Sequence, residues 1–169
     1  MVDIEADGPI PGKYSMVSFG AVIVRPGLSD TFFGKIHPVS THWIPDALKV
    51  SGYTREETLK FDEPRKVMAE FRDWIAKYSI NRPRFIADNN GFDWQFINYY
   101  FHYYLNENPF GFSSTNLGSY YKGCVKDDYK SFKRLRKTKH THNPVDDAMG
   151  NAEALLTMKD KFHINMKLE

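Results

Sequence analysis

The stretch Ser15 to Val24 reads SMVSFGAVIV and is apolar and rich in β-branched residues. A run of this kind, followed by a Pro-Gly turn, predicts a buried strand. Met1 to Glu5 predicts a strand before it, and Gly and Pro residues mark a turn-rich connection between the two. Thr31 to Val39 (TFFGKIHPV) predicts a third strand after it. The chain therefore opens with three consecutive strands.

Helices and strands alternate in the rest of the chain. A helix is expected from Pro64 to about Tyr78, with apolar residues at core spacing. Residues 84–88 predict a short strand, and the aromatic segment Phe92–Leu105 predicts a second helix. The last helix is expected from Pro144 to about Phe162, with Asn143 as its N-cap. This order predicts an α/β fold, a mixed sheet covered by helices on both faces.

The remaining segments have weaker patterns. Pro38 and Pro45 bracket a stretch that we expect to be irregular, and residues 106–116 are rich in Asn, Pro, Gly and Ser, which predicts a loop. Residues 117–125 predict a short helix or a pair of strands. The sequence shows no repeat and no linker, so residues 1–169 are predicted to form a single domain.

The composition is that of an ordinary globular protein, with 41% hydrophobic residues, 26% charged residues and a net charge of +2. The lone cysteine, Cys124, excludes an internal disulfide framework and fits a reducing compartment. The sequence shows neither a signal peptide nor an apolar run of the ~20 residues that span a bilayer. A cytoplasmic location is therefore expected. The small net charge does not by itself indicate nucleic-acid binding.

The first strand contains Asp3 and Glu5, separated by Ile4. Alternate residues of a strand project to the same face, so the two carboxylates can point at one spot while Ile4 enters the core. Carboxylate oxygens are preferred ligands of hard divalent cations. The alternative is an acidic pair on a solvated strand face, because Asp-x-Glu is common by chance.

Two further acidic residues are expected at helix starts. Asp93 follows a strand and a Gly turn, and Asp147 lies in the first turn of the last helix. The helix dipole stabilises carboxylates there with or without a function, and Asp146 fits that simpler explanation best. His142 precedes Asp147 by five positions and suits a general base, because imidazole exchanges protons near neutral pH. Three acidic segments with a histidine suit a two-cation phosphoryl-transfer site, which predicts a metal-dependent nuclease.

Three segments support a resemblance: Asp3-Ile-Glu5, Asp88-Asn-Asn-Gly-Phe-Asp93 and His142-Asn-Pro-Val-Asp-Asp147. In order and spacing they resemble the three exonuclease motifs of the DEDDh family, the DnaQ-like 3′–5′ exonucleases of the RNase H-like superfamily. His142 separates the chain from the tyrosine-bearing sister group. Residues 45–53 (PDALKVSGY) resemble the segment that contacts the terminal nucleotide, and residues 151–156 resemble compact single-domain bacterial members. The likeness extends from Met1 to about Lys161.

The resemblance implies an RNase H-like mixed five-stranded sheet, the first three strands antiparallel and the last two parallel, with helices on both faces. It implies that His142 takes a proton from the attacking water and that nucleoside 5′-monophosphates leave from the 3′ end. Two Mg²⁺ or Mn²⁺ ions would be held by four carboxylates, those of Asp3, Glu5, Asp93 and Asp147.

Contacts to the substrate are also implied by the resemblance. Those near the terminal sugar and base fall on Ala6, Asp7, Val50 and Ser51. Asp88 stands where the family often has histidine or another polar residue, and we expect it too to contact the substrate.

Residues 130–139 (KSFKRLRKTK) hold six basic residues immediately before the third motif. A charge run is usually a solvated face. Because this one adjoins the expected active site, we predict a loop that tracks phosphates, with Lys137 and Lys139 nearest the site. Tyr120, Tyr121 and Tyr129 suit base stacking, although most tyrosines are expected in the core.

Several alternatives stay open at this stage. The substrate is expected to be single-stranded or short nucleic acid, with RNA favoured over DNA because no polymerase-like or helicase-like domain accompanies the motifs. A single-stranded DNA exonuclease and a non-catalytic nucleic-acid-binding module are the alternatives. A further hypothesis is a zinc site built on His140 and His142 with Asp146 or Asp147, although the sequence shows no further Cys or His at ligand spacing. The aromatic helix is apolar around much of its circumference, which suggests a homodimer.

Overall fold

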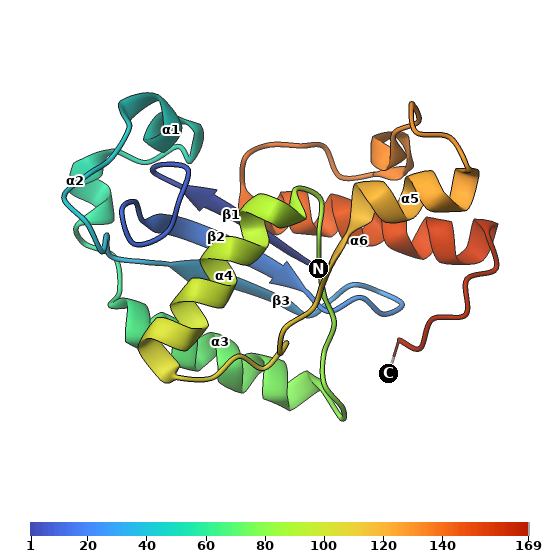
Figure 1. The fold of residues 1–169 in the computed structure, drawn as a ribbon, viewed down its shortest axis with the longest axis horizontal. Helices are drawn as coiled ribbons and strands as arrows, with labels where there is room; N and C mark the ends of the chain where they lie inside the picture. Colours follow the sequence, from blue (N-terminus) through green and yellow to red (C-terminus); the bar gives the residue numbers. More distant parts are fainter. Residues whose placement is uncertain (169) are drawn as a thin grey trace.

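The first three strands form an antiparallel sheet, as the sequence predicts. In the computed structural model, which describes residues 1–168, these strands are β1 (Val2–Ala6), β2 (Met16–Val22) and β3 (Thr31–Lys35). Their order in the sheet is β1-β2-β3, and both pairs are antiparallel (Figure 1). β2 is buried along its whole length, which its apolar and β-branched sequence explains.

Helices cover both faces of this sheet. One face, with Ile4 and Phe19, packs against α3 (Pro64–Tyr78) and α4 (Asn90–Leu105). The other face lies under α6 (Pro144–Lys161), beside which α5 (Leu117–Val125) packs. Successive side chains of β1 point to opposite faces of the sheet. Ile4 points towards α3 and α4, so Asp3 and Glu5 point towards α6. The predicted bounds of the three long helices agree with the structure to within about two residues.

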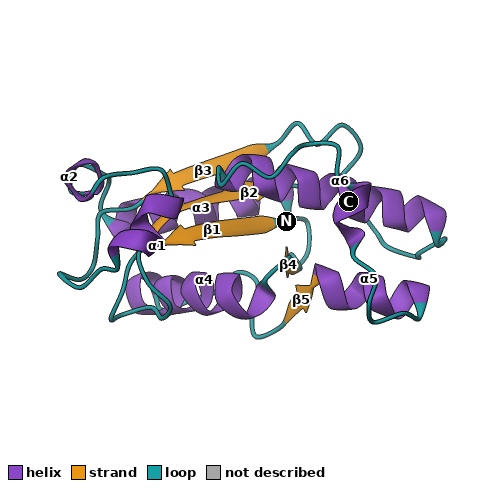
Figure 2. Ribbon diagram, turned by 90° about the horizontal axis from the view of Figure 1, so that it is seen from above, coloured by secondary structure: helices purple, strands orange, loops and turns teal. Residues whose placement is uncertain are grey.

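The predicted single five-stranded sheet is wrong in one respect. β4 (Phe85–Ala87) and β5 (Ser114–Asn116) pair in parallel, as expected, but as a separate two-stranded sheet. Figure 2 shows this pair beside β1, between α4 and α5. The mixture of antiparallel and parallel pairing is therefore confirmed, while the continuous ladder from β1 to β4 is absent from the described residues.

A carboxylate interrupts the ladder between β1 and β4. Met1 exchanges both backbone hydrogen bonds with Val22, at 2.8 and 2.9 Å. Because such pairs alternate along an antiparallel ladder, the amide of Ile4 points away from β2, towards β4. This amide donates to Asp93 Oδ1 at 3.1 Å, so a side chain from α4 takes the position of a strand carbonyl.

Short elements occupy segments where the sequence predicted none or left the choice open. α1 (Pro45–Val50) has proline in its first turn, and α2 (Arg55–Thr58) begins with a capping box made by Thr54 and Glu57. Residues 117–125 form a helix, and β5 lies at the end of the predicted 106–116 loop. A 3-10 turn, η1 (Phe132–Leu135), lies within the basic segment. Such short elements depend on tertiary contacts more than on periodicity.

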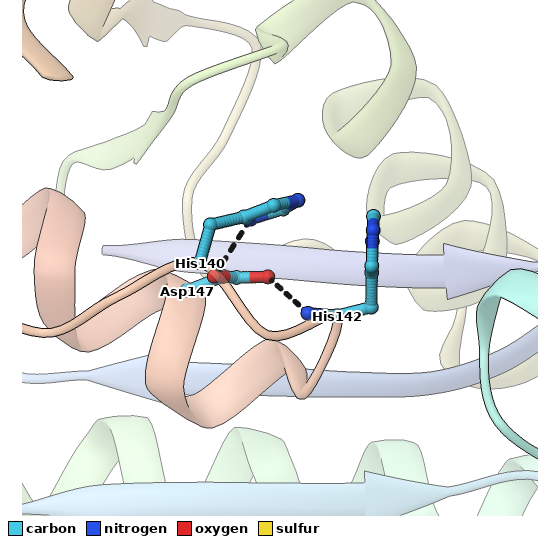
Figure 3. A group of neighbouring side chains, drawn as sticks. All are labelled: His140, His142 and Asp147. Carbon is cyan, nitrogen blue, oxygen red and sulfur yellow. Dashed lines mark hydrogen bonds and ion pairs between the residues drawn. The ribbon is translucent and has the colours of Figure 1, made fainter.

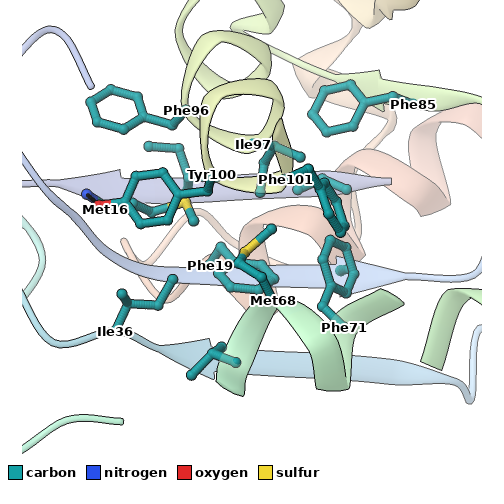
Figure 4. Packing of buried hydrophobic residues seen from close by; sticks show 14 of the residues in the cluster. Met16, Phe19, Ile36, Met68, Phe71, Phe85, Phe96, Ile97, Tyr100 and Phe101 are labelled. Carbon is teal, nitrogen blue, oxygen red and sulfur yellow. Dashed lines mark hydrogen bonds between the residues drawn. The ribbon is translucent and has the colours of Figure 1, made fainter. Parts of the chain in front are cut away.

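Aromatic packing explains why α4 is apolar around much of its circumference. Phe96, Tyr100 and Phe101 are fully buried in the core, and Figure 4 shows the Phe101 ring beside Phe71. The Tyr100 hydroxyl oxygen accepts a hydrogen bond from the Met16 amide at 2.8 Å. The monomer core thus accounts for much of this surface, and the homodimer stays an untested prediction. Residues 1–168 contain no helix with the length and apolar character that crossing a bilayer requires.

Candidate active site

Three of the four predicted metal-binding carboxylates meet between β1 and α6. Oxygen atoms of Asp3, Glu5 and Asp147 all lie within 4.8 Å of one another. Asp3 and Glu5 come from the α6 side of β1, and Asp147 comes from the first turn of α6. Residues at opposite ends of the chain therefore form one cluster, as the motif pattern predicted.

Gly20 allows α6 to approach the sheet this closely. It is the register partner of Asp3 on β2. A Cβ atom at this position would lie 2.3 Å from the backbone carbon of Pro144 and 2.3 Å from the backbone nitrogen of Val145. The first turn of α6 therefore rests directly on the β2 backbone, and this contact sets the distance between Asp147 and β1.

The Asp147 carboxylate is held by donors on the loop before α6. Its Oδ1 accepts from the amide of Thr141 at 3.2 Å and from Arg136 Nη2 at 3.1 Å. Its Oδ2 accepts from the amide of His142 at 3.1 Å. His140 Nδ1 lies 2.8 Å from Oδ1, and Figure 3 shows both histidines beside this carboxylate. Asp147 is only 1% exposed, so these donors fix its position before any ligand binds.

Arg136 and Glu153 fasten this loop to α6. The Arg136 side chain is 7% exposed and also donates to the backbone carbonyl of Asp147 at 3.0 Å. It fits because Gly150 has no side chain: a Cβ atom there would lie 2.5 Å from Arg136 Nε. Glu153 accepts from the amides of Lys137 and Thr138 at 2.8 and 2.7 Å. The end of the basic segment is thereby tied to the helix that bears Asp147.

Asp93 approaches the cluster from α4. Its Oδ1 accepts from the Ile4 amide at 3.1 Å, whereas its buried Oδ2 has no hydrogen-bond partner among residues 1–168. Burial raises the pKa of Asp93 to about 7, against the lowering effect of the Ile4 amide. A buried carboxylate oxygen without a donor is costly unless something positive meets it.

The two β1 carboxylates are also destabilised as anions. Burial, and then repulsion from Asp93, Asp147 and Glu5, raise the pKa of Asp3 well above its ordinary value. Burial and the charge of Asp147 raise the pKa of Glu5 to about 7. Arg136 opposes this effect at Asp3 and only partly offsets it. The cluster therefore has more negative charge than its protein surroundings neutralise.

His142 reaches the same cluster from the loop. Its Nδ1 lies 3.8 Å from Glu5 Oε1, and its side chain is 51% exposed. Its backbone adopts a left-handed conformation with φ of 60°, which lets its amide bind Asp147 while its ring projects towards β1. The predicted general base thus lies beside two of the predicted metal ligands, Glu5 and Asp147.

The predicted substrate contacts divide into buried and exposed groups. Ala6 and Ser51 are buried, and the Ser51 hydroxyl donates to the Leu48 carbonyl. Asp7 is fully buried: Oδ1 accepts from the Ser15 amide at 2.6 Å and Oδ2 from Arg55 at 2.9 Å. The Asp7 side chain therefore fixes a loop and does not face solvent. Val50, the last residue of α1, is 46% exposed.

The basic segment, residues 130–139, likewise contains side chains that bind other protein groups and side chains that are exposed. Lys133 lies 3.7 Å from Asp88, and Arg134 donates to the Tyr121 hydroxyl at 2.9 Å. Within residues 1–168, Lys137 and Lys139 are exposed and form no ion pair. Tyr121 is buried and Tyr129 is fully exposed, so the predicted stacking role suits Tyr129 alone of these two.

Four residues that build the site were not predicted from the sequence. Gly20 and Gly150 give room for close contacts, and Arg136 and Glu153 hold the loop. Gly150 gave a signal, since glycine inside a helix is unfavourable and marks close packing. Arg136 belongs to the segment predicted to track phosphates, but its charge is used inside the site. This part of the predicted role of the basic segment is wrong.

Comparison with known proteins shows the family. Residues 1–155 match the family model described as exonuclease, RNase T type. The 3′–5′ DNA exonuclease Cap18 of Escherichia coli is 36% identical over 179 residues, which cover 99% of this chain and 94% of that protein. The chain belongs to the DEDDh 3′–5′ exonucleases of the RNase H-like superfamily. It is a nuclease that acts on nucleic acid, as the motifs predicted.

Solved structures share the fold at low sequence identity. The nuclease domain of 3′hExo, a DEDDh family member bound to rAMP, has a TM-score of 0.76 and 18% identity, with 95% of this chain and 90% of that chain covered. Cell-death related nuclease 4 (CRN-4) has a TM-score of 0.73 and 14% identity, covering 95% of this chain and 62% of that one. Escherichia coli exonuclease I in complex with a dA16 oligonucleotide has a TM-score of 0.72 and 15% identity, covering 95% and 40%.

Proposed function

We propose that this protein is a two-metal-ion exonuclease that releases nucleoside 5′-monophosphates from the 3′ end of single-stranded DNA. Asp3, Glu5, Asp93 and Asp147 would hold the cations, and His142 would act as general base. The observation that supports this proposal best is the convergence of the Asp3, Glu5 and Asp147 oxygens within 4.8 Å. Asp93 adds a fourth carboxylate beside β1.

The residues fit divalent cations in both charge and donor type. The unpartnered Oδ2 of Asp93 and the raised pKa values of Asp3 and Glu5 are features that a cation would relieve. A set of carboxylate oxygens suits Mg²⁺ or Mn²⁺. When bound, the cations supply charge neutralisation at the scissile phosphate and acidify the attacking water.

The protein's own groups would do the remaining work. His142, half exposed and 3.8 Å from Glu5, can accept the proton of a water molecule at the cluster. Arg136 holds Asp147, and its buried position keeps the guanidinium away from the substrate. Lys137 and Lys139 would contact backbone phosphates on the approaching strand.

The terminal nucleotide would lie at the end of β1. Ala6, Val50, Ser51 and Asp88 are the proposed contacts around it, and Asp7 would act indirectly by fixing the loop through Arg55. In the proposed complex the exposed Val50 side chain packs on the last sugar or base. Substitution of Val50 by a larger residue would then raise KM.

DNA is favoured over RNA by the named relative, which is a DNA exonuclease matching nearly the whole chain. The preference for RNA expected from the sequence gains no support from that relative. The fold is shared with a nuclease domain bound to a ribonucleotide, so the fold itself is compatible with either sugar. Discrimination rests on contacts to the 2′ position.

The decisive experiment is a time course on 5′-labelled single-stranded DNA and RNA of one sequence. Mg²⁺ or Mn²⁺ should give a ladder that shortens from the 3′ end, faster on DNA, and EDTA should stop it. Asp147→Asn and His142→Asn should remove the ladder, while His102→Gln, on the exposed side of the last turn of α4, should not. Faster degradation of RNA would overturn the DNA proposal, and no shortening of either strand would overturn the exonuclease mechanism.

A further inference from the structure

We infer that His140, His142 and Asp147 form a binding site for Zn²⁺, which inhibits the enzyme when it binds there; this site shares Asp147 with the carboxylate cluster and differs from it in its two imidazole ligands. Nitrogen atoms of the two histidines and an oxygen of Asp147 all lie within 4.8 Å of one another. The inhibitory part of this inference rests on the proposed function, because it requires His142 to be the general base.

The geometry suits a small cation with nitrogen ligands. His140 Nδ1 is 2.8 Å from Asp147 Oδ1. The centroids of the two imidazole rings are 4.3 Å apart, and the angle between the ring planes is 70°. Zn²⁺ binds imidazole nitrogen and carboxylate oxygen at about 2.0–2.2 Å, so the ligand atoms of a zinc site lie roughly 3–3.5 Å apart. Small rotations of two side chains therefore convert the present arrangement into three zinc ligands, with a fourth position open to water.

The two histidines are exposed and free to rotate, whereas the buried Asp147 is already in place. The His140 and His142 side chains are 55% and 51% exposed, so they turn without disturbing the core. Asp147 is fixed by the amides of Thr141 and His142 and by Arg136, and needs no movement. Figure 3 shows the carboxylate beside the His140 ring and the His142 backbone amide, and both histidines come from one short loop.

Ligand chemistry separates this site from the carboxylate cluster. Imidazole is a good ligand for Zn²⁺, Co²⁺ and Ni²⁺ and a poor one for Mg²⁺. Excess Mg²⁺ should therefore leave the histidine site available to Zn²⁺. Bound Zn²⁺ occupies a ring nitrogen of His142, which can then no longer accept a proton, and it draws on Asp147 at the same time. Inhibition at saturating Mg²⁺ follows from both effects.

The first test measures binding without substrate. Co²⁺ is titrated into the full-length protein in excess Mg²⁺, and the visible absorption of low-coordinate Co²⁺ is followed and then displaced with Zn²⁺. His140→Gln should weaken binding at least about tenfold, since even the loss of an outer partner of a metal ligand costs ~10- to 100-fold. His140→Cys, which supplies another zinc ligand, should retain binding, and His102→Gln should bind as the wild type does.

The second test measures inhibition of Mg²⁺-dependent nuclease activity by Zn²⁺. For His140→Gln, the Zn²⁺ concentration that halves the variant's own rate should rise by at least about tenfold. Unchanged Co²⁺ and Zn²⁺ binding by His140→Gln would place the ion in the carboxylate cluster and overturn the inferred site. Binding that is lost in His140→Gln, with inhibition unchanged, would overturn the inhibitory role. If the protein has no nuclease activity, the binding titration still decides whether the site exists.

Discussion

The two sides of the carboxylate cluster are stabilised in different ways. On the α6 side, Asp147 is surrounded by donors: two backbone amides, a buried arginine and an imidazole. On the β1 side, Glu5 and Asp93 are buried and Asp3 is half-buried, all three have few donors, and their pKa values are raised. The protein's own donors therefore neutralise Asp147, whereas Asp3, Glu5 and Asp93 need positive charge from a bound ion.

This difference explains how the site can be rigid and still attract a cation. Asp147 is preorganised, so little ordering is needed when a cation arrives. The β1 carboxylates provide the unsatisfied charge that attracts the cation. Mutations on the two sides should therefore have similar effects on activity and opposite effects on the stability of the metal-free protein.

The largest expected effects come from Asp147→Asn and Asp93→Asn, compared directly. Both should lower nuclease activity by at least about 100-fold, because each removes a charge that stabilises the transition state. Asp147→Asn should also destabilise the metal-free protein by about 3–5 kcal/mol, since it leaves Arg136 buried without its anion. Asp93→Asn should leave that stability unchanged or increase it, because a buried charge is removed.

Urea denaturation in EDTA measures the two stabilities, and the nuclease time course measures the activities. A stability loss in Asp93→Asn as large as that in Asp147→Asn would show that the two sides do not differ as described. Asp146→Asn is the matched control, because Asp146 has the same charge one position away and, within residues 1–168, accepts a side-chain hydrogen bond only from the Thr141 hydroxyl, at 3.0 Å.

Gly20→Ala should have the next largest effect, through the distance between the two sides. The new methyl group would overlap the α6 backbone at 2.3 Å, and backbone cannot rotate away as a side chain can. Overpacking of this kind costs about 1–3 kcal/mol, and displacement of Asp147 should lower activity as well. Gly123→Ala is the control, because no side chain or neighbouring element among residues 1–168 lies within 4 Å of the position that its methyl group would take. Equal activity and stability of the two variants would show that Gly20 does not set this distance.

Gly20 also illustrates how far the sequence could predict the structure. The alternation in β1 predicted that Asp3 and Glu5 share a face, and the Pro144 signal predicted where α6 begins. Both patterns are local. The closeness of β2 and α6 depends on a contact between residues more than 120 positions apart, which no local pattern records.

The separation of β4 from β1 has the same origin. The resemblance implied a continuous five-stranded sheet, and the sequence does not show that the Ile4 amide binds Asp93 in place of a β4 carbonyl. Arg136 was likewise indistinguishable from its basic neighbours, since burial at 7% exposure depends on the space left by Gly150. The motifs predicted the residues of the candidate site, and no local pattern predicted the residues that position them.

The pH dependence of stability should follow the β1 side. The pKa of Glu5 rises from 4.5 to about 7 on folding, and that of Asp93 from 3.8 to about 7. Between those limits the folded protein binds more protons than the unfolded chain, so the free energy of unfolding falls as pH increases. In EDTA, Tm should therefore fall from about pH 4.5 to about pH 7.

Mn²⁺ should reverse this loss at the upper end of the range, because it binds the ionised carboxylates of the folded state. Glu5→Gln should flatten the profile in EDTA and weaken the gain from Mn²⁺. Differential scanning calorimetry across this range measures both effects. A Tm that rises towards neutral pH in EDTA would show that the β1 carboxylates are satisfied without a cation.

The smallest expected effect concerns the lysines outside the cluster. Lys137 and Lys139 are exposed, so their replacement by glutamine should leave folding and the cluster unchanged. Each replacement should weaken DNA binding and reduce the slope of log K against log salt by about 1, since each lysine would neutralise one phosphate. Arg136→Gln should instead abolish activity at every salt concentration, because that arginine holds Asp147. Fluorescence anisotropy with a labelled DNA strand in Ca²⁺ measures the slopes. An unchanged slope in Lys137→Gln and Lys139→Gln would show that neither lysine contacts a phosphate.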